Sequence, residues 1–179
     1  VYKRQVPEDA PYLVDLFENM SQDSRYQRYL QTLEHIDMER VWSTAEQIAE
    51  GMAINSHGLL AFCDMVERPD VPVAAARYVY TDAGEAEIGI SVRDDMQGLG
   101  IGAQLMGLLL DEARRAGVER LVALFHSDNV AIRTIFNKLD CRLTRKPDGM
   151  YTYITLYIGE PLDVMDAAAD FSPEARFIG

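Results

Sequence analysis

The sequence predicts an α/β fold in which a mixed, mostly antiparallel central sheet carries helices on both faces. Residues 7–50 show helical periodicity, and three apolar, strand-like runs follow between residues 58 and 92. From residue 101 onward, helices alternate with short strands. A hairpin followed by helix–strand alternation is typical of a layered domain with helices on both sides of its sheet.

A chain of 179 residues suits one domain with its own core. We expect this domain to span residues 1–160. Residues 161–179 then form an acidic C-terminal extension, in which four carboxylates accompany a single Arg176. The chain does not begin with Met, and one interpretation of Val1–Gln5 is a truncated or foreign edge, so no element is predicted there.

Three helices are expected before the first long strand. Pro7 begins the first, because proline is favoured in the first turn, and apolar residues follow at helical spacing: Leu13, Leu16, Phe17 and Met20. The second runs from about Ser24 to Leu33. The third runs from Met38 to Glu50, and Gly51 is its expected C-terminal cap.

The next segment predicts a hairpin and a third strand with two distinct faces. The hairpin consists of Gly58–Val66 and Val71–Thr81, and the third strand is Ala86–Val92. Because side chains alternate along a strand, the third strand has an apolar face and a mixed face. The apolar face carries Ile88, Ile90 and Val92, and the other carries Glu87, Gly89 and Ser91.

The remaining elements alternate between helix and strand. A helix over Ile101–Ala116 ends before Gly117 and is followed by a buried strand over Leu121–Phe125. Asp128-Asn129 precedes a helix over Val130–Leu139 and supplies candidate caps. A final hairpin joins Cys141–Arg145 to Met150–Ile158 through a turn over Lys146–Gly149.

The formal net charge of −12 argues against nucleic acid as a partner, because an acidic protein repels phosphate backbones. The same charge would attract a cationic substrate, or it can serve solubility alone. We expect no membrane partner, since no apolar run approaches the roughly 20 residues that span a bilayer. The oligomeric state is open, with a homodimer as one option.

The two cysteines and three histidines give no metal-binding pattern. Cys63 and Cys141 are far apart, and the histidines form no paired-ligand motif, so we expect no metal. Both thiols are expected to be buried rather than nucleophilic. A low cysteine content is typical of a reducing compartment, and the expected location is the cytoplasm.

Three glycines mark the most informative segment of the sequence. Gly98, Gly100 and Gly102 lie between the strand ending at Val92 and the helix beginning at Ile101. Glycines allow close approach of the backbone, and a helix N-terminus adds free N–H groups and positive potential. The sequence therefore predicts a site for a pyrophosphate.

Read alone, Gly98–Ala103 also fits the dinucleotide-binding pattern G-x-G-x-x-A. The context disfavours that interpretation. In a dinucleotide fold the first strand of the domain leads directly into the first glycine. Here residues 93–96 intervene, three strands come earlier, and the next strand is followed by His126 rather than an acid.

Read from Gln97, the same loop resembles the coenzyme A pyrophosphate loop of the GNAT superfamily of N-acetyltransferases. The pattern Gln97-x-x-Gly100-x-Gly102 follows a strand and begins a helix, as it does in that family. Asn129 resembles the asparagine that the family places at the pantetheine arm. The element order matches the GNAT fold over residues 2–158, almost the whole chain.

The resemblance implies that acetyl-CoA is the donor substrate and assigns residues to it. Backbone groups at Ile90 and Val92 would bind pantetheine, because the family's sheet opens beyond this strand. The pyrophosphate would be held by the backbone N–H groups of Gln97, Gly98, Leu99, Gly100, Ile101 and Gly102. Asn129 would contact the pantetheine or thioester end, and it can equally serve as a plain helix cap.

Amine acetylation needs a base, because an ammonium group has no lone pair with which to attack a thioester. Glu87 is the expected base. It lies on the mixed strand face, and similar GNAT protein acetyltransferases carry a glutamate near the start of this strand. Glu85, two residues earlier on the same face, is the reserve candidate, and an exposed structural carboxylate is the alternative.

The general acid is less well defined by the pattern. Many GNAT enzymes carry a tyrosine seven residues after the asparagine, where this chain has Phe136, which we group with the cofactor-lining residues. His126 and Ser127 are the expected substitutes, and Tyr151 or Tyr153 could also reach the thioester. Alternatively, the thiolate leaves unassisted, because an ordinary thiol pKa is only about 8.5.

Two classes of acceptor are expected. The segments Phe17–Tyr29 and Val92–Gly98 resemble bacterial Pat-type protein lysine acetyltransferases, which implies a protein lysine. The negative charge points instead to a polycationic small molecule, such as an aminoglycoside or polyamine, near Asp23, Glu34 and Asp37. A third possibility, from a different class, is a non-catalytic acyl-CoA sensor, consistent with Phe136.

Overall fold

The computed structural model describes residues 1–30, 36–51, 55–66, 68–82 and 84–159. Its strands are β1 (Tyr2–Arg4), β2 (Ser56–Met65), β3 (Arg68–Asp82), β4 (Glu85–Val92), β5 (Arg120–His126), β6 (Arg142–Asp148) and β7 (Tyr151–Tyr157). Its α-helices are α1 (Ala10–Glu18), α2 (Gln22–Tyr29), α3 (Met38–Gly51), α4 (Ile101–Arg115) and α5 (Val130–Asn137). Two 3-10 turns, η1 (Pro7–Asp9) and η2 (Asp94–Met96), precede α1 and α4. The expected acidic extension, residues 161–179, lies outside the described residues.

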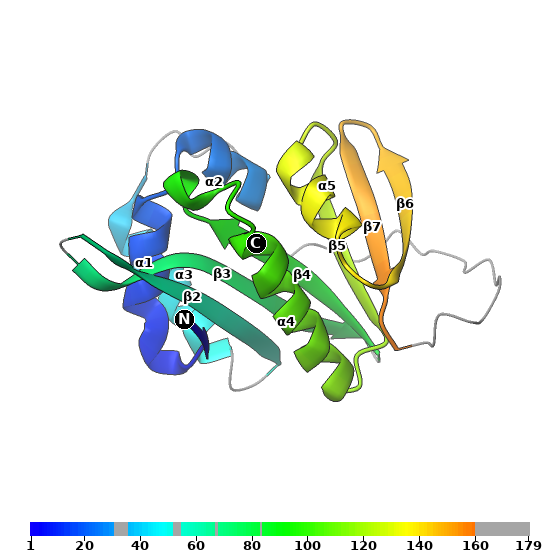
Figure 1. Cartoon of the computed structure of the whole chain (residues 1–179), viewed down its shortest axis with the longest axis horizontal. Helices are drawn as coiled ribbons and strands as arrows, with labels where there is room; N and C mark the ends of the chain where they lie inside the picture. Colours follow the sequence, from blue (N-terminus) through cyan, green and yellow to red (C-terminus); the bar gives the residue numbers. More distant parts are fainter. Residues whose placement is uncertain (31–35, 52–54, 67, 83, 160–179) are drawn as a thin grey trace.

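The strands form one seven-stranded sheet in the order β1-β2-β3-β4-β5-β7-β6. Only β4 and β5 are parallel; the other described neighbours are antiparallel. Helix α4 packs on the face that carries Ile90 and Val92, and α2 packs on the opposite face, against Gly89 (Figure 1). The predicted mixed sheet with helices on both faces is confirmed.

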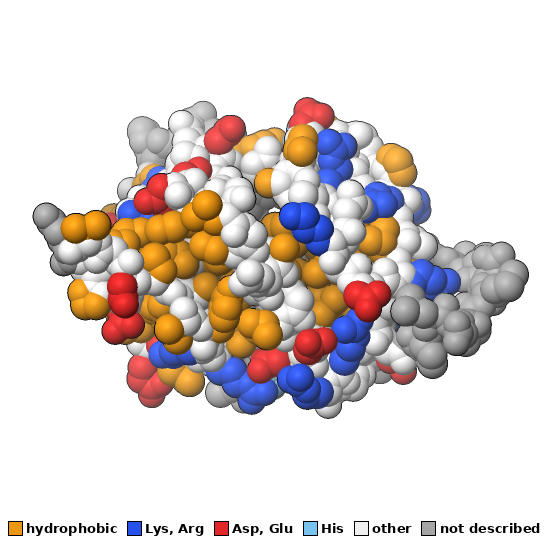
Figure 2. Space-filling view, viewed as in Figure 1, with side chains coloured by type: hydrophobic (Ala, Val, Ile, Leu, Met, Phe, Trp, Pro, Cys, Tyr) orange, Lys and Arg blue, Asp and Glu red, His pale blue; other side chains and the backbone are white. Residues whose placement is uncertain are grey.

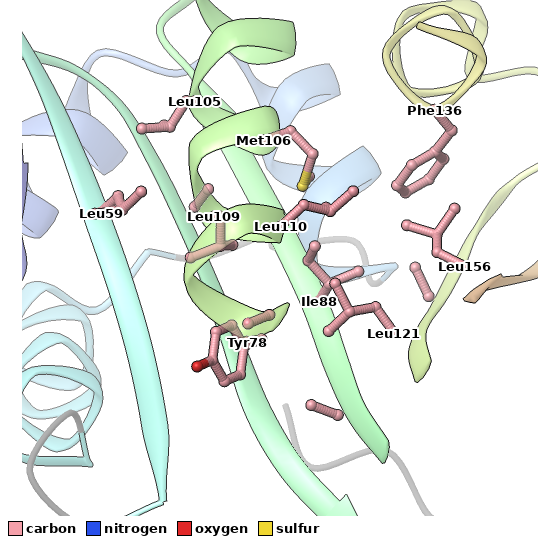
Figure 3. Packing of buried hydrophobic residues seen from close by; sticks show 14 of the residues in the cluster. Leu59, Tyr78, Ile88, Leu105, Met106, Leu109, Leu110, Leu121, Phe136 and Leu156 are labelled. Carbon is pink, nitrogen blue, oxygen red and sulfur yellow. The ribbon is translucent and has the colours of Figure 1, made fainter. Parts of the chain in front are cut away.

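The main core lies between α4 and the sheet. Four α4 side chains are at most 2% exposed: Leu105, Met106, Leu109 and Leu110. They pack over strand residues that include Leu59, Tyr78, Ile88, Leu121 and Leu156 (Figure 3). Burial of these side chains supplies the main stabilisation of the domain, at roughly 1.5–3 kcal/mol for each large apolar side chain. The same packing fixes the position of α4 relative to β4.

The N-terminal residues contribute more to the sheet than expected. Tyr2–Arg4 form β1, an edge strand paired with residues 59–61 of β2. Side chains strengthen this attachment, because the Tyr2 hydroxyl donates to Gln104 Oε1 at 2.6 Å and Arg4 forms an ion pair with Glu112 at 2.8 Å. No element was predicted at Val1–Gln5, and the structure shows that Tyr2–Arg4 add an edge strand to the sheet.

Several predicted boundaries differ from the structure. Helix α2 ends at Tyr29 rather than Leu33, because Leu30 adopts a left-handed conformation (φ +53°) that stops the helix. Gly51 is the last residue of α3 rather than a cap beyond it. The final turn is shorter than expected, because β6 continues to Asp148 and Gly149 turns the chain with φ +59°. Pro147 is tolerated because β6 is an edge strand.

None of the helices in the described part of the chain combines the length and hydrophobicity needed to cross a membrane. The cysteines Cys63 and Cys141 are both free and only partly buried, whereas the sequence predicts that both are buried.

Candidate functional site

Strands β4 and β5 pair over only three residues before they diverge. The parallel ladder joins residues 85–87 to residues 120–122. Beyond it, β4 continues to Val92, whereas β5 stays paired with β7. We call residues 88–92 and 123–126 the β4–β5 fork (Figure 1). Their facing backbone groups have no strand partner in the described chain, so they can hydrogen-bond an extended ligand.

The glycine loop lies at the open end of β4, directly before α4. Gly98 and Gly100 both adopt left-handed conformations, with φ of +75° and +84°. Apart from the adjoining residues of the loop, no atom of the described residues lies within 4 Å of the position that a Cβ would take at either glycine. Since α4 begins at Ile101 with its first N–H groups free of helical partners, the loop and helix together form a site suited to an anion.

Gly102 has a different role from the two loop glycines. A Cβ on this residue would lie 2.9 Å from Ile135 Cδ1 and 3.3 Å from Val92 Cγ2. The missing side chain therefore allows α4, α5 and β4 to approach one another at the fork. Neighbouring loop residues divide between surface and core, because Leu99 is 66% exposed and Ile101 packs against the core.

Gln97 attaches the loop to the structure around it. Its Nε2 donates to the Val92 carbonyl oxygen and to Ser24 Oγ, both at 3.2 Å. Asp94, in η2, adds a second attachment to α2: its carboxylate accepts hydrogen bonds from the backbone N–H and hydroxyl of Ser21 and from the Ser24 hydroxyl. Asp94 was not among the site residues predicted from the sequence.

The side chains of Ile90 and Val92 pack against the core on the α4 face. Any contact they make with a ligand at the fork therefore comes from their backbone groups, as the sequence analysis expects. On α5, Asn129 Oδ1 accepts the Ile132 N–H at 2.9 Å, so this side chain caps the helix. Phe136 is 1% exposed and packs 5.7 Å from the Phe125 ring, which places it inside the core rather than on a ligand surface.

Glu87 lies at the base of the fork, in the last residue pair that joins β4 to β5. It is half-buried and faces away from α4. Burial raises the pKa of Glu87 above its ordinary value, and the cations Arg28 and Arg77 oppose that rise. A raised pKa makes a carboxylate a stronger base. The reserve candidate, Glu85, forms an ion pair with Arg120 at 3.4 Å.

Cross-strand register places further side chains on the Glu87 side of the sheet. Val122 is opposite Glu87, so His126, four residues along β5, shares its face. Tyr151 and Tyr153 share it too, because they pair with His126 and Leu124. We call this surface the Glu87 face. Tyr153 interacts electrostatically with Glu87, since burial, Asp148 and Glu87 together raise the pKa of Tyr153.

The two expected acid candidates occupy different surroundings. The His126 ring lies 5.8 Å from the Tyr151 ring and 6.2 Å from the Tyr26 ring, on the Glu87 face. Its Nδ1 lies 3.3 Å from the Asp128 backbone nitrogen and 3.8 Å from the Asp128 carboxylate. Ser127 instead shares a 2.8 Å hydrogen bond with the Thr152 hydroxyl.

Two arginines on the Glu87 face were missed in the sequence analysis. Arg77 is directly opposite Gly89 in the β3–β4 pair. Arg28, from α2, covers the same glycine, because a Cβ on Gly89 would lie 2.7 Å from Arg28 Nη2. Strand alternation could have identified Arg77, but only with the register of the hairpin known.

The acidic residues expected to attract a polycation are only partly described by the structure. Asp23 and Asp37 are exposed, and Glu34 lies outside the described residues. Among the residues that the structure describes, no three His, Cys, Asp or Glu side chains are placed to hold a metal ion together.

Comparison with known proteins identifies a family. The family model described as "Acetyltransferase (GNAT) domain" matches residues 4–142. Acetyltransferase Pat from Mycolicibacterium smegmatis is 40% identical over 80 residues, which are 44% of this chain and 24% of that protein. Acetyltransferase PA5475 from Pseudomonas aeruginosa is 35% identical over 77 residues, 42% of this chain and 41% of that protein. The match thus spans less than half of each curated relative.

Solved structures share the fold. The GNAT domain of PAT from S. lividans has a TM-score of 0.69 at 21% identity and covers 86% of this chain and 88% of its own. The acetyltransferase yncA from Salmonella typhimurium, solved with acetyl-CoA, has a TM-score of 0.61 at 21% identity and covers 94% and 98%. A cAMP-binding acyltransferase from Mycobacterium smegmatis has a TM-score of 0.55 at 23% identity and covers 97% and 46%.

Proposed function

Because the chain belongs to the GNAT family of acetyltransferases, we propose that it transfers an acetyl group from acetyl-CoA to a primary amine, with Glu87 as the base. The observation that carries this proposal is the β4–β5 fork. It combines an unpaired strand edge, an anion-binding loop at its open end and a half-buried carboxylate at its base.

The residues at the fork suit coenzyme A. The free space at Gly98 and Gly100 and the N-terminus of α4 would accept the pyrophosphate. The unpaired backbone of residues 88–92 would accept the amide groups of pantetheine, which follow each other along an extended arm. Bound there, acetyl-CoA would supply a thioester carbonyl and a thiol leaving group.

Glu87 would prepare the amine. An acceptor enters as an ammonium, and its nitrogen attacks a carbonyl carbon only after it has lost a proton. The carboxylate of Glu87, made more basic by burial, would accept that proton directly or through a water molecule. Arg28 and Arg77 favour the ionised form of this carboxylate, because both oppose the effect of burial on its pKa.

His126 is our candidate for the acid that protonates the departing thiolate. It lies on the Glu87 face. Its protonated ring would give one proton to the thiolate and be left as the neutral imidazole. Ser127 is a weaker candidate because Thr152 already engages its hydroxyl. Phe136 has no proton to give, so the acid of this chain differs from the tyrosine common in the family.

The acceptor is a primary amine of either class that the sequence suggests, a protein lysine or a cationic small molecule. The similarity to Pat over 80 residues supports the lysine class. We place the reaction in the cytoplasm, where acetyl-CoA and amine acceptors are both available.

The test is a thiol-release assay with acetyl-CoA and a panel of amines: lysine peptides, polyamines, aminoglycosides and amino acids. We expect release that depends on at least one amine. Tight coenzyme A binding without release for any amine would instead support the runner-up function, a non-catalytic acyl-CoA sensor.

A further inference from the structure

Two arginines interact electrostatically on the Glu87 face, beside Gly89. Arg77 is the cross-strand partner of Gly89, and paired residues direct their side chains to the same face. A Cβ on Gly89 would lie 2.7 Å from Nη2 and 2.8 Å from Cζ of Arg28. Because Gly89 has no side chain, the Arg28 guanidinium can lie against the strand at this residue.

Neither guanidinium has an anionic partner in the part of the chain that the structure describes. The ion pairs within 4.0 Å there involve other residues, and the recorded contact of Arg28 is with the Tyr29 ring, 5.4 Å from its Cζ. Glu87 interacts electrostatically with both arginines but forms no ion pair with either among these residues. One carboxylate therefore accompanies two cations.

This arrangement is costly without a further anion. Like charges in a partly buried site repel each other, and desolvation adds to the penalty. Burial, followed by Arg28, lowers the pKa of Arg77 to about 10, whereas Tyr29 and Glu87 raise it. A carboxylate held by both guanidinium groups would relieve the repulsion and form charge-assisted hydrogen bonds, which are among the strongest in proteins.

We propose that Arg28 and Arg77 bind a carboxylate of the acceptor, so that the preferred acceptor is an amine with a carboxylate nearby, as in an amino acid. This proposal rests on the proposed function, since it places the acceptor amine at Glu87. Gly89 is two residues from Glu87 on the same face, about 7 Å along the strand. A short amino acid can span that distance between Glu87 and the two arginines.

The site is separate from the expected pyrophosphate site. The arginines lie on the face of β4 opposite to α4, whereas the glycine loop leads into the N-terminus of α4. In this arrangement the selectivity for the acceptor does not depend on the net negative charge of the protein. Arg28 and Arg77 would select the acceptor by its carboxylate, and Glu87 would bind its amine.

The test compares ω-amino acids with their carboxamides. Glycine, β-alanine and γ-aminobutyrate are assayed beside glycinamide, β-alaninamide and γ-aminobutyramide, with kcat/KM measured by thiol release. Lysine peptides with acidic or neutral flanking residues distinguish a protein source of the carboxylate from a free amino acid. We expect at least one acid to be preferred over its amide by about tenfold, the value of one hydrogen bond to a charged group.

Variants test whether the two arginines cause the preference for acids over amides. Arg28→Gln and Arg77→Gln should each lose it, while the Kd for coenzyme A stays unchanged. Arg115→Gln is the matched control, because it removes one exposed cation at the far end of α4. Arg28→Lys keeps the charge and should restore part of the preference, which a purely structural role would not predict.

Equal use of acids and amides by the wild-type protein would overturn the inference and leave the proposed function intact. Weakened coenzyme A binding in both arginine variants would also overturn it, by assigning the cations to the donor. Calorimetric binding of the same six compounds to the coenzyme A complex gives a readout without turnover. Carboxylate-selective binding without acetylation would support the subsite and contradict the proposed function.

Discussion

Glu87 combines two opposing influences in one carboxylate. Burial favours its neutral form, and Arg28 and Arg77 favour its charged form. A general base must be ionised before the reaction, which the arginines favour. It must also be basic enough to accept a proton during the reaction, which burial favours. The position of Glu87 at the last paired residue of β4 places this balance where the two strands begin to diverge.

His126 and Ser127 are neighbours with different expected roles. His126→Ala should lower kcat about 10²-fold, the effect typical of losing a general acid, while the KM for acetyl-CoA changes little. Ser127→Ala should retain most of the activity, because its hydroxyl is bonded to Thr152. Steady-state kinetics of both variants checks this; a larger loss of kcat in Ser127→Ala would exchange the two assignments.

The glycine loop gives a second prediction at the residue scale. Gly100→Ala forces an alanine into a left-handed conformation (φ +84°), at a cost of about 1–2 kcal/mol, and places a methyl group where the pyrophosphate is expected. The Kd for coenzyme A should rise at least tenfold. Gly107→Ala, in the middle of α4, should stabilise the protein by about 0.5–1 kcal/mol and leave the Kd unchanged.

Calorimetric titration and thermal unfolding of the two glycine variants separate affinity from stability. Equal affinity of Gly100→Ala and the wild-type protein would remove this loop from the donor site.

The position of Arg77 shows what the sequence could not predict. A hairpin continued from the Asp82–Glu85 pair without interruption would place Arg77 opposite Ile90, on the α4 face. A register shift between Tyr80 and Asp82 moves it opposite Gly89 instead. One inserted residue transfers a whole strand segment to the other face, and nothing in the turn sequence specifies that insertion.

Helix α2 links the donor loop to the acceptor face. Its N-terminus is held by Asp94, which follows β4, and its last turn carries Arg28 over Gly89. Ser24 also receives a hydrogen bond from Gln97, within the donor loop. Binding at the loop and the placement of Arg28 therefore depend on the same short helix.

Asp94→Asn should weaken this link. The amide is a poorer acceptor for the three hydrogen bonds from Ser21 and Ser24, so we expect a loss of about 1 kcal/mol in stability, since the site is largely exposed. KM should rise for both acetyl-CoA and the amine. Although burial acts in the other direction, hydrogen bonds from Ser24 and Ser21 lower the pKa of Asp94 below its ordinary value.

The lowered pKa of Asp94 determines how its contribution to stability changes with pH. A carboxylate whose folded pKa is lowered stabilises the protein above its unfolded pKa, and this contribution is lost as the pH falls through the folded value. The difference in Tm between the wild-type protein and Asp94→Asn should therefore be constant near neutral pH and shrink in strong acid. A difference that grows on acidification would contradict this account of the helix attachment.

At the element scale, patterning predicted most of the fold. Apolar periodicity located α1, α3, α4 and the strands, and glycine and proline located most of the ends. The β4–β5 fork was accessible only through family resemblance, because strand pairing depends on contacts distant in sequence. Strand β1 was missed because a three-residue edge strand has too little periodicity to recognise.

The net charge of −12 is unevenly distributed along the sequence. Five acidic residues lie in residues 160–179 alone. On the face that carries α4, Lys and Arg side chains are interspersed with Asp and Glu side chains (Figure 2). Long-range attraction of a polycation is therefore a weaker argument for the acceptor than the local pair of arginines.

Binding of coenzyme A should stabilise the whole domain, because the fork and loop are built from both halves of the sheet. At a ligand concentration of 100 times Kd, the expected gain is about 2.7 kcal/mol. For a chain of this size it corresponds to a rise in Tm of roughly 5–10 °C. Thermal unfolding with and without coenzyme A measures it, and Gly100→Ala should show a smaller shift at equal concentration.

Acetyl transfer with Glu87 as the general base is tested most directly by quantifying free thiol and acetylated amine together. The measurement is made across pH for the wild-type protein and for Glu87→Gln. The account predicts equal amounts of both products for the wild-type protein. Because the base must be ionised, kcat/KM should fall as the pH drops through the raised pKa of Glu87. Glu87→Gln should be slower by about 10²-fold or more and lack that acidic limb. A Glu87→Gln variant with near wild-type rates and an unchanged pH profile would contradict the account.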